Sequence, residues 1–181
     1  IELVLASAGR ALVLLTSHAA INELSKLTRS ALEEEGITVL RQGIDGTPAR
    51  LVEHLKTDPK SVIFGTASLW EGIDIRGEAL SLLIIARLPF NDPTDPIHKA
   101  RSEIYKNGFL EYALPLAILR FRQGFGRLIR DRKDVGVVVV LDSRLTTKRY
   151  GTSFLKALPG CTEITGTSGN IAEEIQTWLN R

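Results

Sequence analysis

One short stretch of this chain gathers residue types that can bind phosphate. It reads Gln123-Gly-Phe-Gly-Arg127-Leu-Ile-Arg130. On a helix, Gln123, Arg127 and Arg130 would stand at i, i+4 and i+7, so all three would share one face. Two guanidinium groups in a row bind the oxygens of a polyphosphate better than a neutral surface does. The spacing therefore predicts a helix that presents one amide and two fixed cations to a phosphate chain.

The opposite face of the same predicted helix is apolar, which predicts that it packs against a core. At the same spacing it carries Leu114, Ile118, Phe121, Phe125 and Leu128. A solvated helix face is the common alternative explanation for so many arginines. Two interior glycines, Gly124 and Gly126, argue against it, because each costs up to about 1 kcal/mol relative to alanine in a helix. They favour the close approach of another element or a ligand, and a local break in the helix is the alternative.

A second polar segment follows an apolar run and reads Gly65-Thr-Ala-Ser68-Leu-Trp70-Glu71-Gly72-Ile-Asp74. The hydroxyls of Thr66 and Ser68 are small donors that suit phosphate oxygens. The carboxylates of Glu71 and Asp74 can accept hydrogen bonds from a ribose hydroxyl or from a neighbouring arginine. A loop with capping side chains is the alternative interpretation.

A third candidate site lies at Thr16-Ser17-His18, directly after another apolar run. Ser17 is predicted to cap a helix. Because the free N–H groups at a helix N-terminus also bind anions, capping and phosphate contact are compatible. The lone histidines His18 and His98 are expected in surface or capping positions rather than in catalysis.

Other kinds of site are missing from the sequence. The chain has no G-x-x-x-x-G-K-[ST] phosphate loop, no strand ending in paired acids that would hold magnesium, and no spacing typical of metal ligands. Its single cysteine, Cys161, excludes an intramolecular disulfide and an all-cysteine metal site. We therefore expect no metal site in this chain. An arginine row without a phosphate loop is typical of the trans-acting half of a nucleotide motor.

Apolar runs without alternation predict buried strands, and capping residues mark the helices between them. Strands are expected over residues 11–15, 37–40, 61–64, 80–88 and 135–141, with a further short strand near Ile164. Helices are expected from Ser17 to about Glu35, from Thr47 to about Lys56, in two segments across 97–130, and over about 170–179.

Strands separated by helices predict an α/β domain with a parallel sheet covered on both faces. In such sheets ligands bind outside the carboxyl ends of the strands. Polar groups directly follow four of the predicted strands, at Thr16-Ser17-His18, Gln42-Gly43, Gly65-Thr66 and Asp142-Ser143-Arg144. The site is therefore expected at this edge of the sheet.

Composition is typical of one ordinary globular domain, with 181 residues, 44% hydrophobic and 24% charged. The net charge of +2 is too small to predict nucleic-acid binding by itself. No apolar run reaches the roughly 18 residues of a membrane span, and no secretory signal is visible. The chain starts at Ile1 and contains no methionine, which predicts that it is a piece of a larger protein.

Several motifs, in this order, resemble those of the second motor domain of superfamily 2 helicases, specifically the DinG/XPD group. The stretch 123–130 resembles motif VI, Q-x-x-G-R-x-x-R, and Ser68-Leu-Trp-Glu-Gly-Ile-Asp74 resembles motif V. Leu14-Leu-Thr-Ser17 resembles motif IV, and Arg41-Gln-Gly43 resembles the short motif after it. Further family signatures match at Arg87-Leu-Pro-Phe90 with Asp95-Pro96, at Asp142-Ser-Arg-Leu145 and at Lys148-Arg-Tyr-Gly151.

The resemblance covers about residues 9–159 and implies one RecA-like three-layer domain over 1–181, with a mostly parallel central sheet and helices on both faces. Residues 160–181 are expected to form a C-terminal extension packed on it. The resemblance also implies that ATP lies between this domain and an absent first motor domain. That partner would supply the phosphate loop and the Mg²⁺ site, and in many family members it carries an iron–sulfur cluster.

Carried over by position, the motifs also imply roles for individual residues. Arg127 and Arg130 would be arginine fingers on the γ-phosphate, and Gln123 would position the nucleotide or couple it to DNA. The ribose side would be lined by Gly72 and Asp74, beside Glu71. Four residues would bind the backbone of single-stranded DNA, namely Ser17, Gln42, Thr66 and Ser68.

The family translocates 5′ to 3′ on DNA, closing and opening the cleft between its motor domains once per ATP. The parent protein is accordingly expected to be a monomer in the bacterial cytoplasm, associated with the nucleoid and not with a membrane. Two other interpretations stay open. One is an RNA-directed or duplex-translocating superfamily 2 motor, against which the Trp-Glu-Gly-Ile-Asp and Leu-Pro-Phe signatures argue. The other is a non-enzymatic nucleotide- or anion-binding module.

Overall fold

The fold was analysed in a computed structural model, which describes residues 1–66, 68–69, 79–129 and 135–180. Four of the predicted site residues, Glu71, Gly72, Asp74 and Arg130, lie outside the described residues, and so does the side chain of Arg127. Each remaining site residue has a described position.

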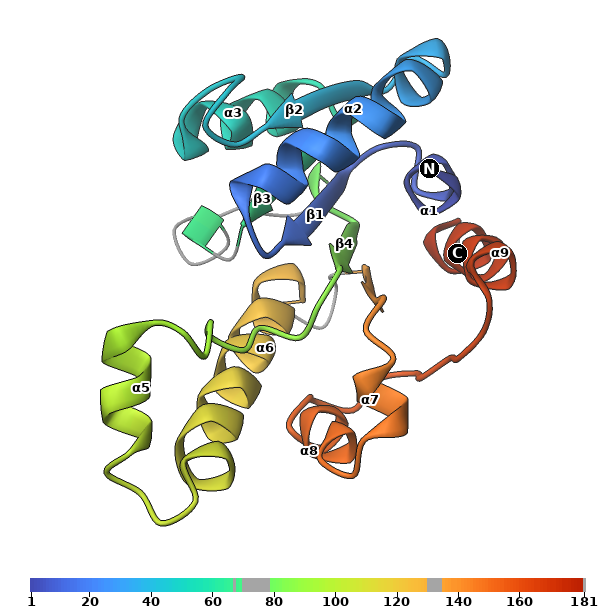
Figure 1. The fold of residues 1–181 in the computed structure, drawn as a ribbon. Coiled ribbons are helices and arrows are strands. Elements are labelled where there is room, and N and C mark those ends of the chain that lie inside the picture. Colours follow the sequence, from blue (N-terminus) through green and yellow to red (C-terminus); the bar gives the residue numbers. More distant parts are fainter. Residues whose placement is uncertain (67, 70–78, 130–134, 181) are drawn as a thin grey trace.

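The centre of the domain is a five-stranded sheet in the order β2-β3-β1-β4-β5, and every neighbouring pair in it is parallel (Figure 1). Its strands are β1 (Ala11–Leu15), β2 (Thr38–Arg41), β3 (Ser61–Thr66), β4 (Leu82–Ile85) and β5 (Val137–Val140). This arrangement confirms the predicted α/β class. It also explains why the strands show no alternation, since both faces of a parallel sheet are buried.

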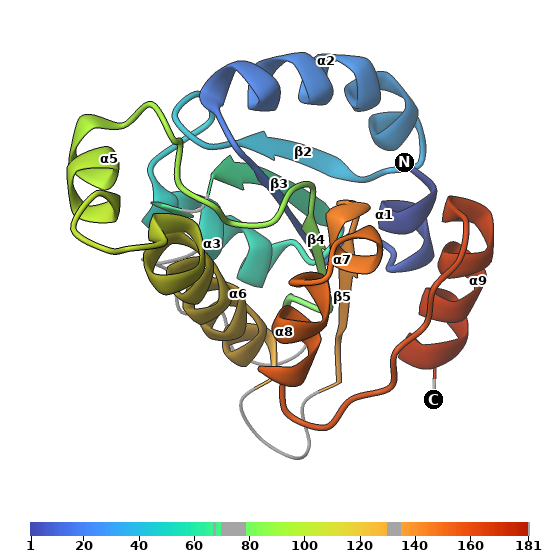
Figure 2. The same cartoon turned by 60° about the horizontal axis from the view of Figure 1, so that its bottom comes forward.

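Helices cover both faces of the sheet, as Figure 2 shows from a second direction. The helical segments are α1 (Glu2–Ala6), α2 (His18–Glu34), α3 (Pro48–Thr57), α5 (Pro96–Ser102), η2 (Phe109–Ala113), α6 (Leu114–Leu128), α7 (Arg144–Thr147), α8 (Gly151–Lys156) and α9 (Ser168–Leu179). Apolar side chains of α3, α6 and α8 form one buried cluster with the sheet. Those of α1, α2 and α9 form another with its opposite face.

Strand β1 illustrates how the sequence serves both layers. Leu12 belongs to the cluster with α3, α6 and α8, whereas its neighbours Ala11 and Val13 belong to the cluster with α1, α2 and α9. Successive side chains of a strand point to opposite faces, so a continuous apolar run supplies both cores at once.

Two of the predicted helix starts are confirmed in detail. The Ser17 side chain accepts the backbone N–H of Ala20 at the start of α2. Thr47 caps α3, where Pro48 takes the first helical position. Because proline has no N–H to leave unpaired and its φ suits a helix, it fits the first turn. Helix α2 also stops where predicted, before Gly36, whose φ of 75° favours glycine.

Three sequence-based expectations need correction. The arginine helix was expected to reach Arg130, but α6 ends at Leu128, and Ile129 has an extended backbone with φ −115° and ψ 103°. Leu128 is buried beside Gly136, where an added Cβ would come within 2.8 Å of it, so the packing of Leu128 on the approach to β5 competes with further helix. No strand forms near Ile164, because residues 161–167 carry no regular structure and the Ile164 side chain is exposed. The strand expected over 80–88 is shorter and spans Leu82–Ile85.

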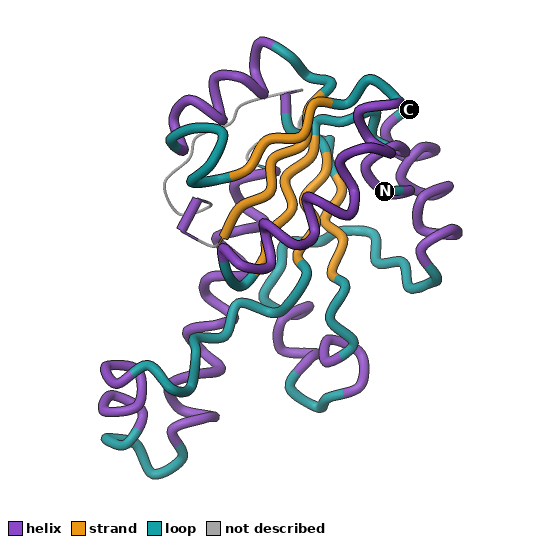
Figure 3. The backbone as a smooth tube through the Cα atoms, turned by 45° about the horizontal axis from the view of Figure 1, so that its top comes forward, coloured by secondary structure: helices purple, strands orange, loops and turns teal. Residues whose placement is uncertain are grey.

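Segments α5, η2 and the start of α6 extend beyond the carboxyl ends of the strands (Figure 3). They connect β4 to β5, and α7 and α8 follow β5 at the same end of the sheet. At the other side of the molecule, α9 lies beside α1 in both cartoon views, with Ile175 buried near Leu3 and Val4. The carboxyl edge is therefore the part of the domain where most of the connecting segments gather.

Candidate nucleotide and nucleic-acid site

The strand order places a topological switch at the centre of the sheet. Strand β1 lies between β3 and β4, so the chain must cross over β1 when it passes from β3 to β4. Connections that leave neighbouring strands in opposite directions open a crevice at their carboxyl ends. Leu15, the last residue of β1, pairs with Thr66, the last residue of β3. The polar groups that follow these strands are thereby brought to one place.

A closed set of hydrogen bonds joins Gln42, Thr66 and Ser68. The Gln42 carbonyl Oε1 accepts the backbone N–H of Thr66 at 2.8 Å and its hydroxyl at 3.2 Å, and Gln42 Nε2 donates to Ser68 Oγ at 3.2 Å. The two hydroxyl oxygens are 2.8 Å apart. Gln42 is buried, with 8% of its surface exposed, while Ser68 is exposed. A buried amide therefore holds two hydroxyls at the surface in fixed positions.

The fourth predicted strand-binding residue, Ser17, is exposed at the start of α2 and follows β1 directly. Its neighbour His18 lies close to the end of β2, since its imidazole carbon Cε1 would stand 3.5 Å from a Cβ placed on Gly43. Gly43 has a φ of 80°, which disfavours any other residue there. The ends of β1, β2 and β3 thus supply all four residues to one edge, and three of them are in direct contact.

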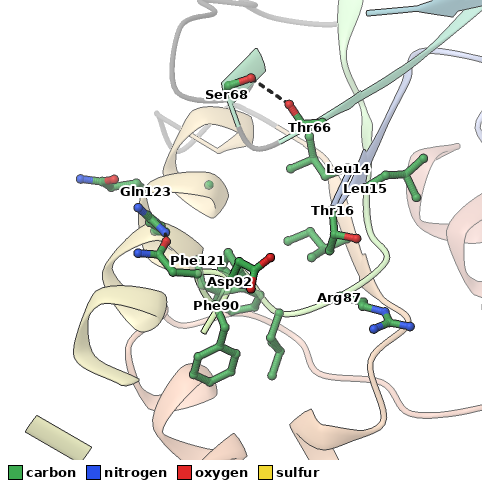
Figure 4. A pocket seen from close by; sticks show the side chains of 16 residues that line it. Leu14, Leu15, Thr16, Thr66, Ser68, Arg87, Phe90, Asp92, Phe121 and Gln123 are labelled. Carbon is green, nitrogen blue, oxygen red and sulfur yellow. Dashed lines mark hydrogen bonds between the residues drawn. The ribbon is translucent and has the colours of Figure 1, made fainter. Parts of the chain in front are cut away.

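Next to this set is an open cleft of about 270 Å³ (Figure 4). Its walls come from the carboxyl ends of β1, β3 and β4, from the loop that follows β4 and from α6. The lining residues that carry polar side chains are Thr16, Thr66, Ser68, Arg87, Asn91, Asp92, Arg120 and Gln123. Figure 4 shows Thr66, Leu14 and Thr16 on one side of the cleft and Phe121 and Gln123 on the other.

Helix α6 carries Gln123 and the backbone of Arg127, two of the three residues of the predicted row. Gln123 is exposed on this helix and lines the cleft, and the backbone of Arg127 continues the same helix one turn later. The apolar face is confirmed, because Leu114, Phe121 and Leu128 are all buried. Of the interior glycines, Gly124 is buried and lines the cleft. At Gly126, nothing in the described part of the chain lies within 4 Å of an added Cβ, so no described element of this chain makes the expected close approach.

The sequence prediction missed several polar groups of the cleft, and Asn91 is one of them. Its Oδ1 accepts a hydrogen bond from the Arg120 guanidinium, and its Nδ2 lies 2.9 Å from His98 Nδ1. His98 was expected in a surface or capping position. It stands in the first turn of α5, only 8% of it is exposed, and its ring packs against Tyr112 at 5.2 Å between centroids. A polar residue directly after a family-like Leu-Pro-Phe signature was the available signal for Asn91. Its partners could not be assigned without the fold.

A second missed arrangement holds the loop after β4 in place. The Asp142 carboxylate accepts the backbone N–H of Leu88 at 2.9 Å, and it is paired with the Arg144 guanidinium, whose Nη2 lies 2.6 Å from Oδ2. Arg144 lies over the ring of Phe90, 5.4 Å from its centroid. Phe90 in turn packs against Phe109, Tyr150 and Phe154. The end of β5 is thereby tied to the loop that forms one wall of the cleft.

This pairing should make stability depend on pH in the acid range. The hydrogen bond from Arg144, aided by the backbone N–H groups of Leu88 and Arg144, lowers the pKa of Asp142 from 3.8 to about 2. Because the folded-state pKa is the lower one, the stabilisation is complete above pH 3.8 and is lost as the pH falls toward 2. We expect Asp142→Asn to lower the free energy of unfolding at neutral pH by about 1 to 2 kcal/mol.

Urea unfolding of this chain at pH 6, 4, 3 and 2 measures the effect. The difference between the wild type and Asp142→Asn should shrink steadily below pH 4. Glu53→Gln, which changes an exposed carboxylate on α3, is the matched control and should show little difference at any of these pH values. A difference for Asp142→Asn that stays constant from pH 6 to 2 would show that the charge of Asp142 does not stabilise the fold.

Among the described helices, none combines the length and the apolar character needed to cross a membrane. Within the same ranges, no group of three or more histidine, cysteine, aspartate or glutamate side chains is arranged to hold a metal ion.

Comparison with known proteins places these features in a family. Residues 1–161 match the model of the helicase C-terminal domain. The chain is 41% identical over 153 residues to the 3'-5' exonuclease DinG of Bacillus subtilis, which covers 82% of this chain and 16% of that protein. It is 40% identical over 158 residues to the ATP-dependent DNA helicase YoaA of Escherichia coli, in a match that covers 85% of this chain and 24% of that protein. It is 43% identical over 162 residues to the ATP-dependent helicase DinG of Mycobacterium tuberculosis H37Rv, in a match that covers 87% of this chain and 24% of that protein.

The chain thus spans between 16% and 24% of the length of these curated relatives. The matched segment contains the whole parallel sheet, the hydrogen-bonded set at its carboxyl edge, and helix α6. The three relatives are DinG and YoaA proteins. Because the family model matches residues 1–161, the chain belongs to the helicase C-terminal domain family.

Proposed function

We propose that this chain is the second motor domain of an ATP-dependent DNA helicase that moves 5′ to 3′ along single-stranded DNA. One observation carries the proposal. The hydroxyls of Thr66 and Ser68, fixed by Gln42, lie on the same cleft as Gln123 of helix α6. Groups suited to a phosphodiester backbone and the helix of the arginine row are therefore neighbours, as a motor that couples ATP to strand movement requires.

In this proposal ATP lies between this domain and a first motor domain of the same polypeptide. Arg127 and Arg130 act as arginine fingers that neutralise charge developing on the γ-phosphate. Gln123 positions the nucleotide, and Gly72 and Asp74 with Glu71 line the ribose side. The first motor domain supplies the Mg²⁺ site, and any iron–sulfur cluster of the parent belongs there too. The parent acts as a monomer in the cytoplasm, at the nucleoid.

The same division of the site explains coupling. Hydrolysis needs both domains to meet around ATP, and the strand also bridges both domains. Closure then changes the affinity for ATP and the affinity for the strand together, so the two sites are linked by a coupling free energy. Helix α6 is the physical link in this chain, because its residues line the cleft beside Thr66 and continue into the arginine row.

Removing either hydroxyl should weaken strand binding. In the complete polypeptide we expect Thr66→Ala or Ser68→Ala to raise the Kd for single-stranded DNA by about tenfold, since each loses one hydrogen bond to a charged phosphate. The loss should be the same for oligonucleotides of different sequence, because backbone contacts carry no sequence information. Fluorescence anisotropy with labelled strands measures it, and Thr146→Ala, an exposed threonine on α7, serves as control. Unchanged affinity in both variants would remove these residues from the strand track.

The direction of movement has its own test. An unwinding assay compares a duplex that carries a 5′ single-stranded tail with one that carries a 3′ tail. Our proposal predicts unwinding from the 5′ tail, dependent on ATP. Preference for the 3′ tail, or equal activity on RNA or blunt duplex, would favour a different superfamily 2 motor.

A further inference from the structure

We propose that the cleft between β1, β4 and α6 holds one unpaired base of the translocating strand, and that the Asn91 amide contacts the edge of that base. This deepens the proposed function and rests on it, because the strand is taken from there. The shape of the cleft, its polar rim and the fixed position of Asn91 support the proposal independently of one another.

The interior of the cleft suits a flat aromatic ring. Its apolar lining comes from the two strands, the loop and the helix, and consists of Leu14, Leu15, Ile85, Leu88, Pro89, Phe90 and Phe121. Its volume of about 270 Å³ corresponds to roughly nine water molecules, enough for a single heterocycle and too little for a base pair. Bases unstacked from a single strand bind to such apolar and aromatic surfaces largely regardless of sequence.

The rim of the cleft suits the rest of a nucleotide. Thr66 and Ser68 offer neutral hydroxyls on one side, as small donors for a phosphodiester. The charged rim residues are Arg87, Arg120 and Asp92, so their formal charges sum to +1. A strand carries one negative charge per nucleotide, whereas ATP brings about four to one place and needs a strongly cationic site. This balance favours a strand nucleotide over a free one.

Asn91 is held ready to contact a base edge. Its carbonyl accepts from Arg120, and its amide nitrogen lies 2.9 Å from the imidazole Nδ1 of buried His98. An amide has two lone pairs and two N–H groups, so after these two bonds it can still offer one acceptor and one donor. Each of the four DNA bases carries both a donor and an acceptor on its Watson–Crick edge. A fixed amide can therefore bind any of them, which fits a motor that must pass all sequences.

The cleft shares a helix with the proposed ATP site, so a bound base can affect that site. Arg120, Phe121, Gln123 and Gly124 form its wall on α6, and the same helix continues to Arg127. A base in the cleft would thus contact the helix that is proposed to complete the ATP site. Entry and departure of one base would then be sensed once per step of the strand.

The test uses the complete polypeptide and a set of oligonucleotides that each carry one abasic site, moved one position at a time. Strand affinity is measured by anisotropy, and ATPase stimulation is measured with the same strands. For the wild type we expect one position at which the missing base lowers affinity about tenfold. For Asn91→Ala that position should become no more sensitive than its neighbours, while Asn22→Ala on α2 should leave the profile unchanged.

Because Asn91→Ala also removes a partner of Arg120, a second variant keeps the test decisive. Thr16→Phe places a bulky ring at the exposed rim, where it should fill the cleft without entering the core. It should flatten the abasic profile in the same way, with an unchanged melting temperature.

Three outcomes would overturn the proposal. A flat abasic profile in the wild type, with normal strand binding, removes the base site but leaves the proposed function standing. Loss of ATP binding in Thr16→Phe with an intact abasic profile assigns the cleft to a free nucleotide instead. If the wild type binds no single-stranded DNA at all, the proposed function fails and the base site fails with it.

Discussion

Arg127→Ala in the complete polypeptide is expected to lower ATP turnover by about 10³- to 10⁵-fold, the range known for the loss of an arginine finger. This corresponds to about 4 to 7 kcal/mol of transition-state stabilisation. The physical reason is that charge on the transferring phosphoryl group must be neutralised by a cation held in a fixed place. The resemblance of the stretch 123–130 to motif VI supports this role, and helix α6 places the backbone of Arg127 one turn after Gln123, which lines the cleft.

The measurement is steady-state phosphate release at saturating ATP and single-stranded DNA. The matched control is Arg122→Ala, which removes an exposed arginine from the same helix and should keep turnover within a fewfold of the wild type. Thermal unfolding should be the same for both variants, because each arginine has a charged residue type and stands apart from the apolar spacing of the helix. If Arg127→Ala turned over ATP at a rate near that of the wild type, Arg127 would not be an arginine finger.

The second large effect that we expect is the complete dependence of catalysis on a partner domain. This chain by itself should hydrolyse no ATP above background, even with saturating single-stranded DNA and Mg²⁺. Its sequence lacks the phosphate loop that would hold the triphosphate, and an arginine finger cannot act without that loop. The complete polypeptide, assayed in parallel, should show turnover stimulated by the strand.

The control for this experiment is a preparation of the chain carrying Arg127→Ala, which should give the same background rate. Hydrolysis that is stimulated by the strand and lost in that variant would show that a full site exists within this chain. Tight ATP binding without hydrolysis would instead favour a nucleotide-binding module.

The sequence was sufficient to predict the layers of the fold, for reasons that are local. Ala11–Leu15 reads as a buried strand because it is uniformly apolar, and Ser17 and Thr47 mark helix starts because their side chains can satisfy free N–H groups. Family-like spacing then indicated that Gln42, Thr66 and Ser68 act together. Their mutual hydrogen bonds agree with that grouping, while their role toward DNA stays a prediction.

What the sequence could not give depends on contacts between distant segments. Helix α6 ends at Leu128, which packs next to Gly136, and no capping side chain in the sequence marks that end. Asn91 and Arg120 are 29 residues apart, and Leu88 and Asp142 are 54 apart, so neither pairing leaves a local pattern. Short helices such as α7 and α8 were missed for the same reason, since tertiary packing rather than propensity maintains them.

The hydroxyls of Thr66 and Ser68 affect how easily a strand could move across this surface. Their oxygens already bond to each other and to Gln42, so a phosphate that arrives replaces existing hydrogen bonds rather than adding new ones. Breaking these internal bonds offsets part of the free energy that the stronger bonds to a charged phosphate contribute. Each contact therefore adds less to strand affinity, and costs less to release, than a wholly new hydrogen bond would. In the proposed motor, this would lower the barrier for the strand to move between one domain closure and the next.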